Sequence, residues 1–277
     1  MSSGASVSRL LREAAALVYV SDLAAPELAA EDAHHLTAVL RLRPGEVVVA
    51  SDGAGRYRGC RVTTGDASAR GAGSEAARPA SARRGRPPAI TLLPDTDVVA
   101  GERTSPEVTV GFSLAKGDRN DWAVAKLSEL GVDRIVPLAC ERTAVRWEPQ
   151  AATRHVVRLR RIAREASMQA RRVWLPEVLD LLPLSEAATC LGGGIAFAEP
   201  GGGTPSLATP VVLVGPEGGF TAGELAVGFP RVTLGDTILR IETAAVVAGA
   251  ILTALRAGVL APIVTGEQPA VSSDRSE

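Results

Sequence analysis

The sequence predicts an α/β protein in two parts, a β-rich N-terminal domain followed by a larger domain with a mostly parallel sheet. In the first part, residues 47–49 and 57–62 are short apolar runs separated by turn residues, a pattern typical of strands. In the second part, residues 108–114 alternate as a strand does, residues 121–130 carry apolar side chains at helical spacing, and residues 134–138 form another apolar run. This strand–helix–strand order favours parallel pairing.

The domain limits follow from changes in composition along the chain. Residues 65–88 are mainly Ala, Gly, Ser, Arg and Pro, so they cannot bury a core, and we expect them to form a disordered insertion. The expected N-terminal domain therefore covers residues 1–92, the second domain covers 93–265, and residues 266–277 form a disordered tail. Gly131 is expected to end the helix over 121–130. Further strands are predicted at 195–198, 211–214 and 231–234.

Composition excludes several classes of protein. Three cysteines without a CxxC pair and three histidines without ligand spacing argue against a disulfide framework and against a metal site. The most apolar stretch, residues 244–264, contains Arg256 and Pro262, so it is expected to be a buried helix and not a membrane span. We therefore expect a cytoplasmic protein without metal or membrane association. A net charge of −1 does not indicate a nucleic-acid binder, although a local basic stripe is enough for phosphate contact.

A glycine-rich loop follows the buried run 211–214. Residues 215–219 read Gly-Pro-Glu-Gly-Gly, and Thr221 with Glu224 forms a capping box that starts a helix. Glycines let a ligand approach the backbone, and ligands bind at the carboxyl ends of parallel strands. The alternative is a tight strand-to-helix turn with no ligand. The loop is neither a P-loop nor a dinucleotide fingerprint.

Charged residues stand out in two other segments. Arg240 and Glu242 lie in an otherwise apolar segment, residues 234–244, where charges are costly unless they are paired or used. They form either part of a site or a structural ion pair. Residues 154–172 hold seven arginines and one acidic residue, and four of the arginines recur at helical spacing. That run is either a nucleic-acid contact or a solvated helix face.

Together these segments resemble the SPOUT methyltransferases, and more narrowly the bacterial 16S ribosomal RNA (uracil-N3) methyltransferase family. The matching residues occur in this order: His35-Leu36 with Val39-Leu40-Arg41, Lys116-Gly117-Asp118-Arg119, Glu129-Leu130-Gly131-Val132 with Arg134-Ile135-Val136-Pro137-Leu138, Glu141-Arg142, Glu165-Ala166-Ser167 with Gln169 and Arg172, then the two segments starting at Gly215 and Ile238. The chain departs from the family at Asp236-Thr237, Ile241 and Arg171, and these differences concern details of substrate contact.

The resemblance implies a fold and a reaction. It implies a small PUA-like β-barrel that helps to grip RNA, then a parallel-sheet domain with a trefoil knot, paired as a homodimer. The cofactor would be S-adenosylmethionine and the partner 16S ribosomal RNA within the small subunit or its precursor. A non-catalytic RNA-binding assembly factor and a methyltransferase acting on transfer RNA remain as alternatives, whereas a nicotinamide dehydrogenase lacks its fingerprint.

The resemblance also implies roles for individual residues. Arg172 is expected to favour the N3 anion of the target base, because a nearby positive charge lowers a pKa, with Arg240 and Glu242 organising the pocket. Glu217 is a second candidate for a base. The expected cofactor-binding residues are Glu199, Leu213, Gly215, Glu217, Gly218, Leu234, Gly235, Ile238, Leu239 and Arg240. The expected RNA-binding residues are His35, Arg41, Arg43, Arg158, Arg161, Arg164 and Gln169, of which His35 has a purely structural role as its alternative.

Overall fold

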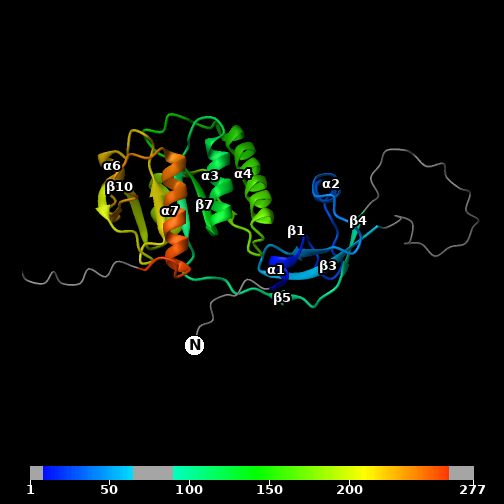
Figure 1. Cartoon of the computed structure of the whole chain (residues 1–277). Helices are drawn as coiled ribbons and strands as arrows, with labels where there is room; N and C mark the ends of the chain where they lie inside the picture. The colour runs from blue at the N-terminus through cyan, green and yellow to red at the C-terminus, as the bar shows by residue number, and fades with distance from the viewer. Residues whose placement is uncertain (1–8, 65–89, 262–277) are drawn as a thin grey trace, which may run out of the picture.

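The computed structural model describes residues 9–64 and 90–261, which form two units side by side (Figure 1). The expected insertion over 65–88 and the expected tail over 266–277 lie outside the described residues. No helix within the two described ranges is long and apolar enough to cross a membrane.

The N-terminal unit is a five-stranded sheet with the order β1-β2-β3-β4, in which β5 also pairs with β3. Strands β1 and β2 are parallel and the other pairs are antiparallel. The sheet continues to Ala100, so this unit ends near residue 100 and not at residue 92 as expected. Its elements are α1 (Arg9–Glu13), β1 (Ala16–Tyr19), α2 (Ala30–His34), the π-helical turn η1 (His35–Val39), β2 (Val47–Ser51), β3 (Arg56–Thr64), β4 (Ile90–Pro94) and β5 (Val99–Ala100).

The second unit is the expected parallel sheet, with the strand order β12-β10-β11-β6-β7-β8 and β9 beside β7. Its strands are β6 (Thr109–Ser113), β7 (Arg134–Ala139), β8 (Glu177–Val178), β9 (Leu182–Pro183), β10 (Ile195–Gly203), β11 (Val211–Val214) and β12 (Arg231–Val232). Its helices are α3 (Arg119–Leu130), α4 (Pro149–Gln169), η2 (Leu184–Glu186), α5 (Ala187–Leu191), α6 (Ala222–Leu225) and α7 (Ile241–Arg256).

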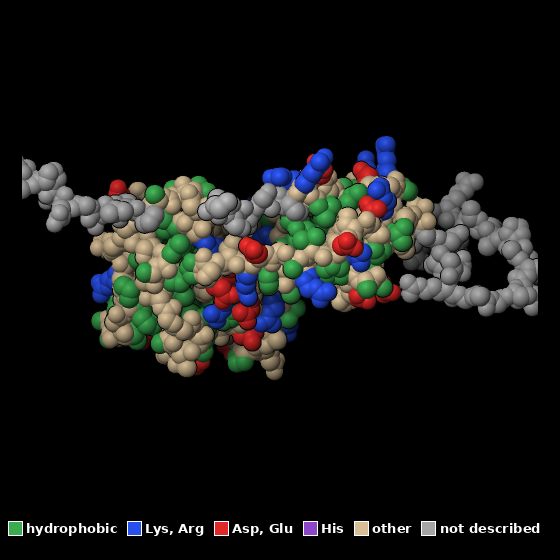
Figure 2. Space-filling model, turned by 90° about the horizontal axis from the view of Figure 1, so that it is seen from below, with side chains coloured by type: hydrophobic (Ala, Val, Ile, Leu, Met, Phe, Trp, Pro, Cys, Tyr) green, Lys and Arg blue, Asp and Glu red, His purple; other side chains and the backbone are tan. Residues whose placement is uncertain are grey.

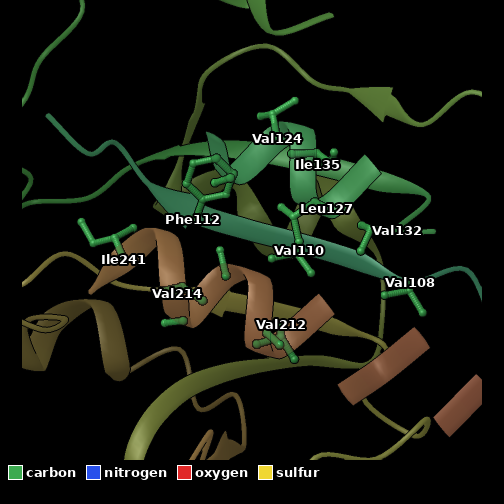
Figure 3. Packing of buried hydrophobic residues seen from close by; sticks show 14 of the residues in the cluster. Val108, Val110, Phe112, Val124, Leu127, Val132, Ile135, Val212, Val214 and Ile241 are labelled. Atoms are coloured by element: carbon green, nitrogen blue, oxygen red, sulfur yellow. The ribbon is translucent and has the colours of Figure 1, made fainter. Parts of the chain in front are cut away.

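Both faces of this sheet are covered. Helices α3, α4 and α7 lie on one face, where their apolar stripes pack on Val110, Phe112 and Ile135 (Figures 1 and 3). The other face packs against η2, α5 and Phe220. Every residue of β6 is buried, including the polar Thr109 and Ser113, although its sequence alternates as that of a half-exposed strand does. A Cβ on Gly111 of β6 would lie 2.7 Å from Leu213, so only glycine fits between the neighbouring strands.

Helix α3 ends as the sequence predicts but begins two residues earlier. Gly131 caps it in the left-handed conformation at φ 91°, which a side chain would disfavour. At the other end, the Asn120 amide accepts from the Ala115 amide at 2.9 Å and donates to the Ala115 carbonyl at 2.8 Å. These two bonds close the loop between β6 and α3, so the helix starts at Arg119.

The chain that leaves α4 joins the two units. The Tyr19 hydroxyl donates to the Arg172 carbonyl at 2.7 Å, and the Gly55 amide donates to the Val173 carbonyl at 3.0 Å. A Cβ on Gly55 would lie 2.3 Å from the Trp174 ring, so glycine is required at this contact. Arg164 of α4 adds a bidentate ion pair with the buried Asp32, at 2.6 and 3.0 Å. The junction therefore combines backbone bonds, a close ring contact and a charge pair.

Candidate functional site

A cavity of about 500 Å³ lies at the carboxyl edge of the parallel sheet. One wall is the end of β10, the second is the glycine loop after β11, and the third is the segment from Thr233 to the start of α7. This volume lies within the range that ligand pockets of small molecules occupy. The cavity is therefore the best candidate for the ligand site expected from the two loop segments.

The glycine loop is held in place from several sides. Phe220 packs under it, so that a Cβ on Gly215 would come within 3.0 Å of the ring. Arg142 donates to the Gly218 carbonyl at 2.8 Å. The predicted capping box is present, because Thr221 accepts from the Glu224 amide and the Glu224 carboxylate accepts from the Thr221 amide. These contacts preorganise backbone groups around a ligand before it arrives.

The opposite wall is an irregular segment without regular hydrogen bonding. Its Gly235 has φ 139°, and the Thr233 hydroxyl bonds the Gly235 carbonyl at 3.1 Å. The Ile238 side chain is 86% exposed although it lines the cavity, so it has apolar surface to offer a bound molecule. Arg240 stands at the N-cap position of α7 and lines the same cavity.

Charged residues line the cavity on both sides. They are Glu199 at the end of β10, Glu217 in the glycine loop, and Arg240. Glu242 does not line the cavity; its Oε1 lies 3.6 Å from Nε of Arg119, and its side chain is 12% exposed. The other carboxylate oxygen of Glu242 is buried and has no hydrogen-bond partner among the residues described. Glu242 therefore ties the start of α7 to the start of α3.

Nine of the ten expected cofactor-binding residues line this cavity, and Leu213 does not. Leu213 is fully buried and belongs to the apolar cluster on the opposite face of the sheet. Because side chains alternate along a strand, the next residue, Val214, lines the cavity instead. The expectation missed eight further lining residues besides Val214, which are Ala198, Pro200, Pro216, Gly219, Thr233, Thr237, Ile241 and Ala244.

Arg172 is not in the cavity, so the chain alone does not support its expected catalytic role. Its guanidinium donates to the carbonyls of Ser128 and Val132, at 2.9 and 3.0 Å, and lies 4.0 Å from Asp133. The side chain is 12% exposed, and burial lowers the pKa of this guanidinium, with the Asp133 carboxylate opposing that shift. Arg172 satisfies the carbonyls at the end of α3, which is a structural role.

The expected RNA-binding residues fall into two groups. His35 and Gln169 meet in a small cavity of about 80 Å³ at the domain junction, while Arg41 and Arg43 are exposed on the following loop. The three expected arginines on α4 are each paired with a carboxylate: Arg158 with Asp121, Arg161 with Glu165, and Arg164 with Asp32.

Figure 2 shows acidic and basic side chains intermixed on one face of the molecule. Of the three α4 arginines that were expected to bind RNA, Arg164 is corrected from a phosphate contact to a domain contact, because its guanidinium is engaged with Asp32 and with the Tyr19 carbonyl at 3.3 Å.

Arg119 and Arg142 are the functional candidates that the sequence analysis left without a role. Each follows the end of a buried strand, β6 or β7, and each reaches a segment at the cavity. Their position after a strand of a parallel sheet could have identified them as functional candidates, because ligands bind at the carboxyl ends of such strands. What the sequence did not indicate was which partner each would contact.

Family models match both units. A model described as an RNA methyltransferase domain matches residues 102–253, more than half of the chain, and one described as an RNA methyltransferase PUA domain matches residues 28–67. A protein of Mycobacterium bovis named ribosomal RNA small subunit methyltransferase E is 31% identical over 242 residues, covering 79% of this chain and 82% of its own. The protein of that name from Bacillus subtilis is 29% identical over 162 residues, covering 50% of this chain and 62% of its own.

Solved structures have the same fold. The Neisseria gonorrhoeae ribosomal RNA small subunit methyltransferase E bound to S-adenosyl methionine superposes with a TM-score of 0.65 at 27% identity, covering 87% of this chain and 97% of its own. A probable rRNA-methyltransferase of Porphyromonas gingivalis gives 0.67 at 24% identity, covering 88% and 100%, which supports the fold alone. With its PUA-like first domain and its parallel-sheet second domain, the chain belongs to the ribosomal RNA small subunit methyltransferase E family of RNA methyltransferases.

Proposed function

We propose that this protein transfers a methyl group from S-adenosylmethionine to N3 of a uracil in 16S ribosomal RNA. The observation that carries the proposal is the cavity of about 500 Å³ lined by two backbone-rich segments of an RNA methyltransferase domain. The relative from Neisseria gonorrhoeae is described as bound to S-adenosyl methionine, and the relatives are named for the small-subunit ribosomal RNA.

The residues present fit this cofactor. A Cβ on Gly218 would meet only Arg142, at 3.5 Å, so the space beside this glycine is open to a ligand. Backbone groups of 215–219 and 234–239 would hold the adenosyl and methionyl parts, and Glu199 and Glu217 would face its positive charges. When bound, the cofactor supplies an activated methyl group on a sulfonium, so the protein has mainly to align the partners and exclude water.

The residues at the cavity also suit the acceptor. N3 of uracil carries a proton, and that proton must leave first. The lone pair of the N3 nitrogen would then attack the methyl carbon as the bond between this carbon and the sulfur breaks. Arg240 lines the cavity and would stabilise the resulting anion, in the role first expected of Arg172, because a guanidinium lowers the pKa of a neighbouring acid. Glu217 is the candidate to accept the proton. Since N3 lies on the Watson–Crick edge, the target base has to be unpaired before reaction.

Methylation of purified small subunits, followed by mass analysis of nucleosides, tests the proposal. We expect 3-methyluridine in 16S ribosomal RNA and none in transfer RNA. Arg240→Ala and Glu217→Gln should lower the single-turnover rate about 100-fold or more, as loss of a general base or charge contact does. Glu186→Gln, at an exposed position of η2, is the matched control. Modified transfer RNA would favour the other substrate, and cofactor binding without turnover on any RNA would favour the assembly factor.

We further propose that the protein acts as a homodimer through α7. Six apolar side chains of this helix are only partly buried, and they recur at helical spacing along one face: Val246, Val247, Ala250, Ile251, Ala254 and Leu255. A contiguous apolar face of this kind favours association. Light scattering should return twice the chain mass at micromolar concentration, and a monomer mass would contradict the proposal.

The trefoil knot and a cytoplasmic location belong to the same proposal. The knot rests on membership of the family and on the parallel sheet order. The location rests on the RNA substrate and on the thiols of Cys60, Cys140 and Cys190, which are all free. Among the described residues, no group of three or more His, Cys, Asp or Glu side chains is placed to hold a metal ion.

A further inference from the structure

A second cavity of about 390 Å³ lies on the same edge of the sheet as the proposed methyl-transfer site. It is formed by the loop after β6, the first turn of α3, and the first turns of α4 with the segment before them. We propose that this cavity binds an unpaired base of the RNA strand that also carries the methylated uracil. The proposal rests on the proposed function for its ligand, and on the residues of this second cavity for its position.

An aromatic pair lines the cavity. The rings of Trp147 and His155 are stacked, with centroids 4.5 Å apart and planes inclined by 17°. Trp147 is partly buried against the core, whereas His155 is exposed. A base that stacks on the exposed face of the His155 imidazole would complete a stack of three rings, and Trp147 at its inner end rests on the core. Proteins recognise single-stranded RNA in this way, by stacking bases on aromatic side chains that include histidine.

Polar groups around the pair match the rest of a nucleotide. Arg158 is held by Asp121 at 2.5 Å, and with 59% of its side chain exposed it can still meet a phosphate. Asp118 makes no side-chain cap bond to α3, so its carboxylate is available to an exocyclic amine of a base. The side-chain oxygen and nitrogen of Asn120 both bond the Ala115 backbone, so Asn120 holds the wall of the cavity in place and does not hydrogen-bond the ligand.

The two cavities are connected through the first turns of α3 and α7. Helices α3 and α4 run side by side in the same direction. Arg158, midway along α4, meets Asp121 near the start of α3, and Arg172, just after α4, meets the Ser128 carbonyl near the end of α3. Arg119, next to Asp118, reaches Glu242, which follows Ile241 of the proposed methyl-transfer site. In this proposal, a strand that places its uracil in the first cavity reaches the second with another of its nucleotides.

Fluorescence anisotropy with a labelled decaribonucleotide of adenosines tests the proposal, because adenine offers a large stacking face and an exocyclic amine. Loss of one stacked base weakens binding by roughly 5- to 100-fold. Trp147→Ala and His155→Ala should each reduce the affinity by this factor. His155→Phe should restore most of it, since a phenyl ring stacks as the imidazole does.

Trp122→Ala is the matched control, because Trp122 is 46% exposed on α3 and does not line the cavity. It should leave the affinity for the oligonucleotide unchanged. Calorimetry with S-adenosylmethionine separates the two proposals: unchanged cofactor affinity in all four variants locates the loss in the second cavity. Failure of the wild-type protein to bind the cofactor would refute the proposed function alone.

Wild-type oligonucleotide affinity in His155→Ala would overturn the inference, whatever its methylation rate. So would a loss that His155→Phe does not restore. His155 is exposed, so its variants are expected to fold, and they decide the question if Trp147→Ala destabilises the protein.

Discussion

The ion pair between Arg164 and Asp32 predicts a loss of stability, and not primarily of RNA affinity, when Arg164 is removed. The pair is bidentate at 2.6 and 3.0 Å, with 5% of the Asp32 side chain and 30% of the Arg164 side chain exposed. The hydrogen bond to Asp32 raises the pKa of Arg164, so folding favours the charged guanidinium. The ring of Tyr19 lies 5.6 Å from this guanidinium and adds a cation–π contact.

The expected magnitude follows from this burial. Removing one partner of a fully buried pair costs about 3–5 kcal/mol, because the other charge is left uncompensated, whereas exposed pairs contribute about 0–1 kcal/mol. The partial exposure of Arg164 places Arg164→Ala between these limits, at about 2–3 kcal/mol. Arg161→Ala, whose pair is exposed on both sides, should stay within about 0.5 kcal/mol of wild type.

Urea unfolding followed by tryptophan fluorescence measures the effect. Trp174 lies at the junction, where its Nε1–H donates to the Gly101 carbonyl at 3.3 Å, so its emission reports separation of the units. A double-mutant cycle with Asp32→Ala should give a coupling of at least about 1 kcal/mol. The interpretation is wrong if Arg164→Ala is as stable as wild type and lowers the slope of log affinity for RNA against log salt concentration by about one. That result would mean that the Arg164 side chain binds a phosphate.

Three further predictions follow from the same contacts. Gly218→Val should abolish the binding of S-adenosylmethionine measured by calorimetry while the fold is retained, because the added side chain fills ligand space and meets only Arg142 in the protein. Wild-type affinity in this variant would mean that the glycine loop does not contact the cofactor. Arg172→Ala should lower the free energy of unfolding by about 2–4 kcal/mol, since two carbonyls lose their donor, and should leave cofactor affinity intact; a stable variant without methylation activity would restore its catalytic role. Burial raises the pKa of Tyr19 to about 12, against about 10 in an unfolded chain. The neutral phenol therefore stabilises the fold fully below pH 10, and this contribution of at most about 3 kcal/mol is lost as the pH rises to 12. Denaturant unfolding between pH 9 and 12 should therefore show a smaller loss for Tyr19→Phe, and parallel curves for the two proteins would contradict the shift.

The sequence by itself determined several of the regular elements, because these depend on local patterns. Apolar runs identified seven of the strands, and the capping box at Thr221 and the glycine at 131 marked helix limits that the structure reproduces. The ordered motifs identified the family, and family membership in turn placed two separate loops in one pocket. Nine of the ten expected cofactor residues line that cavity, since loops at the carboxyl edge of a parallel sheet converge there.

Only the tertiary structure decided how the charged side chains are used. Arg172 is the last residue of a conspicuous basic run, yet its guanidinium turns inward to the end of α3. Arg164, on the helix before it, meets a carboxylate that is 132 residues away in the sequence. Glu242 pairs with Arg119 and not with Arg240, its neighbour on the chain. The spacing of charged residues along a helix predicts the helix face on which they lie. It does not predict their ion-pair partners, because these depend on which distant segment packs against that face.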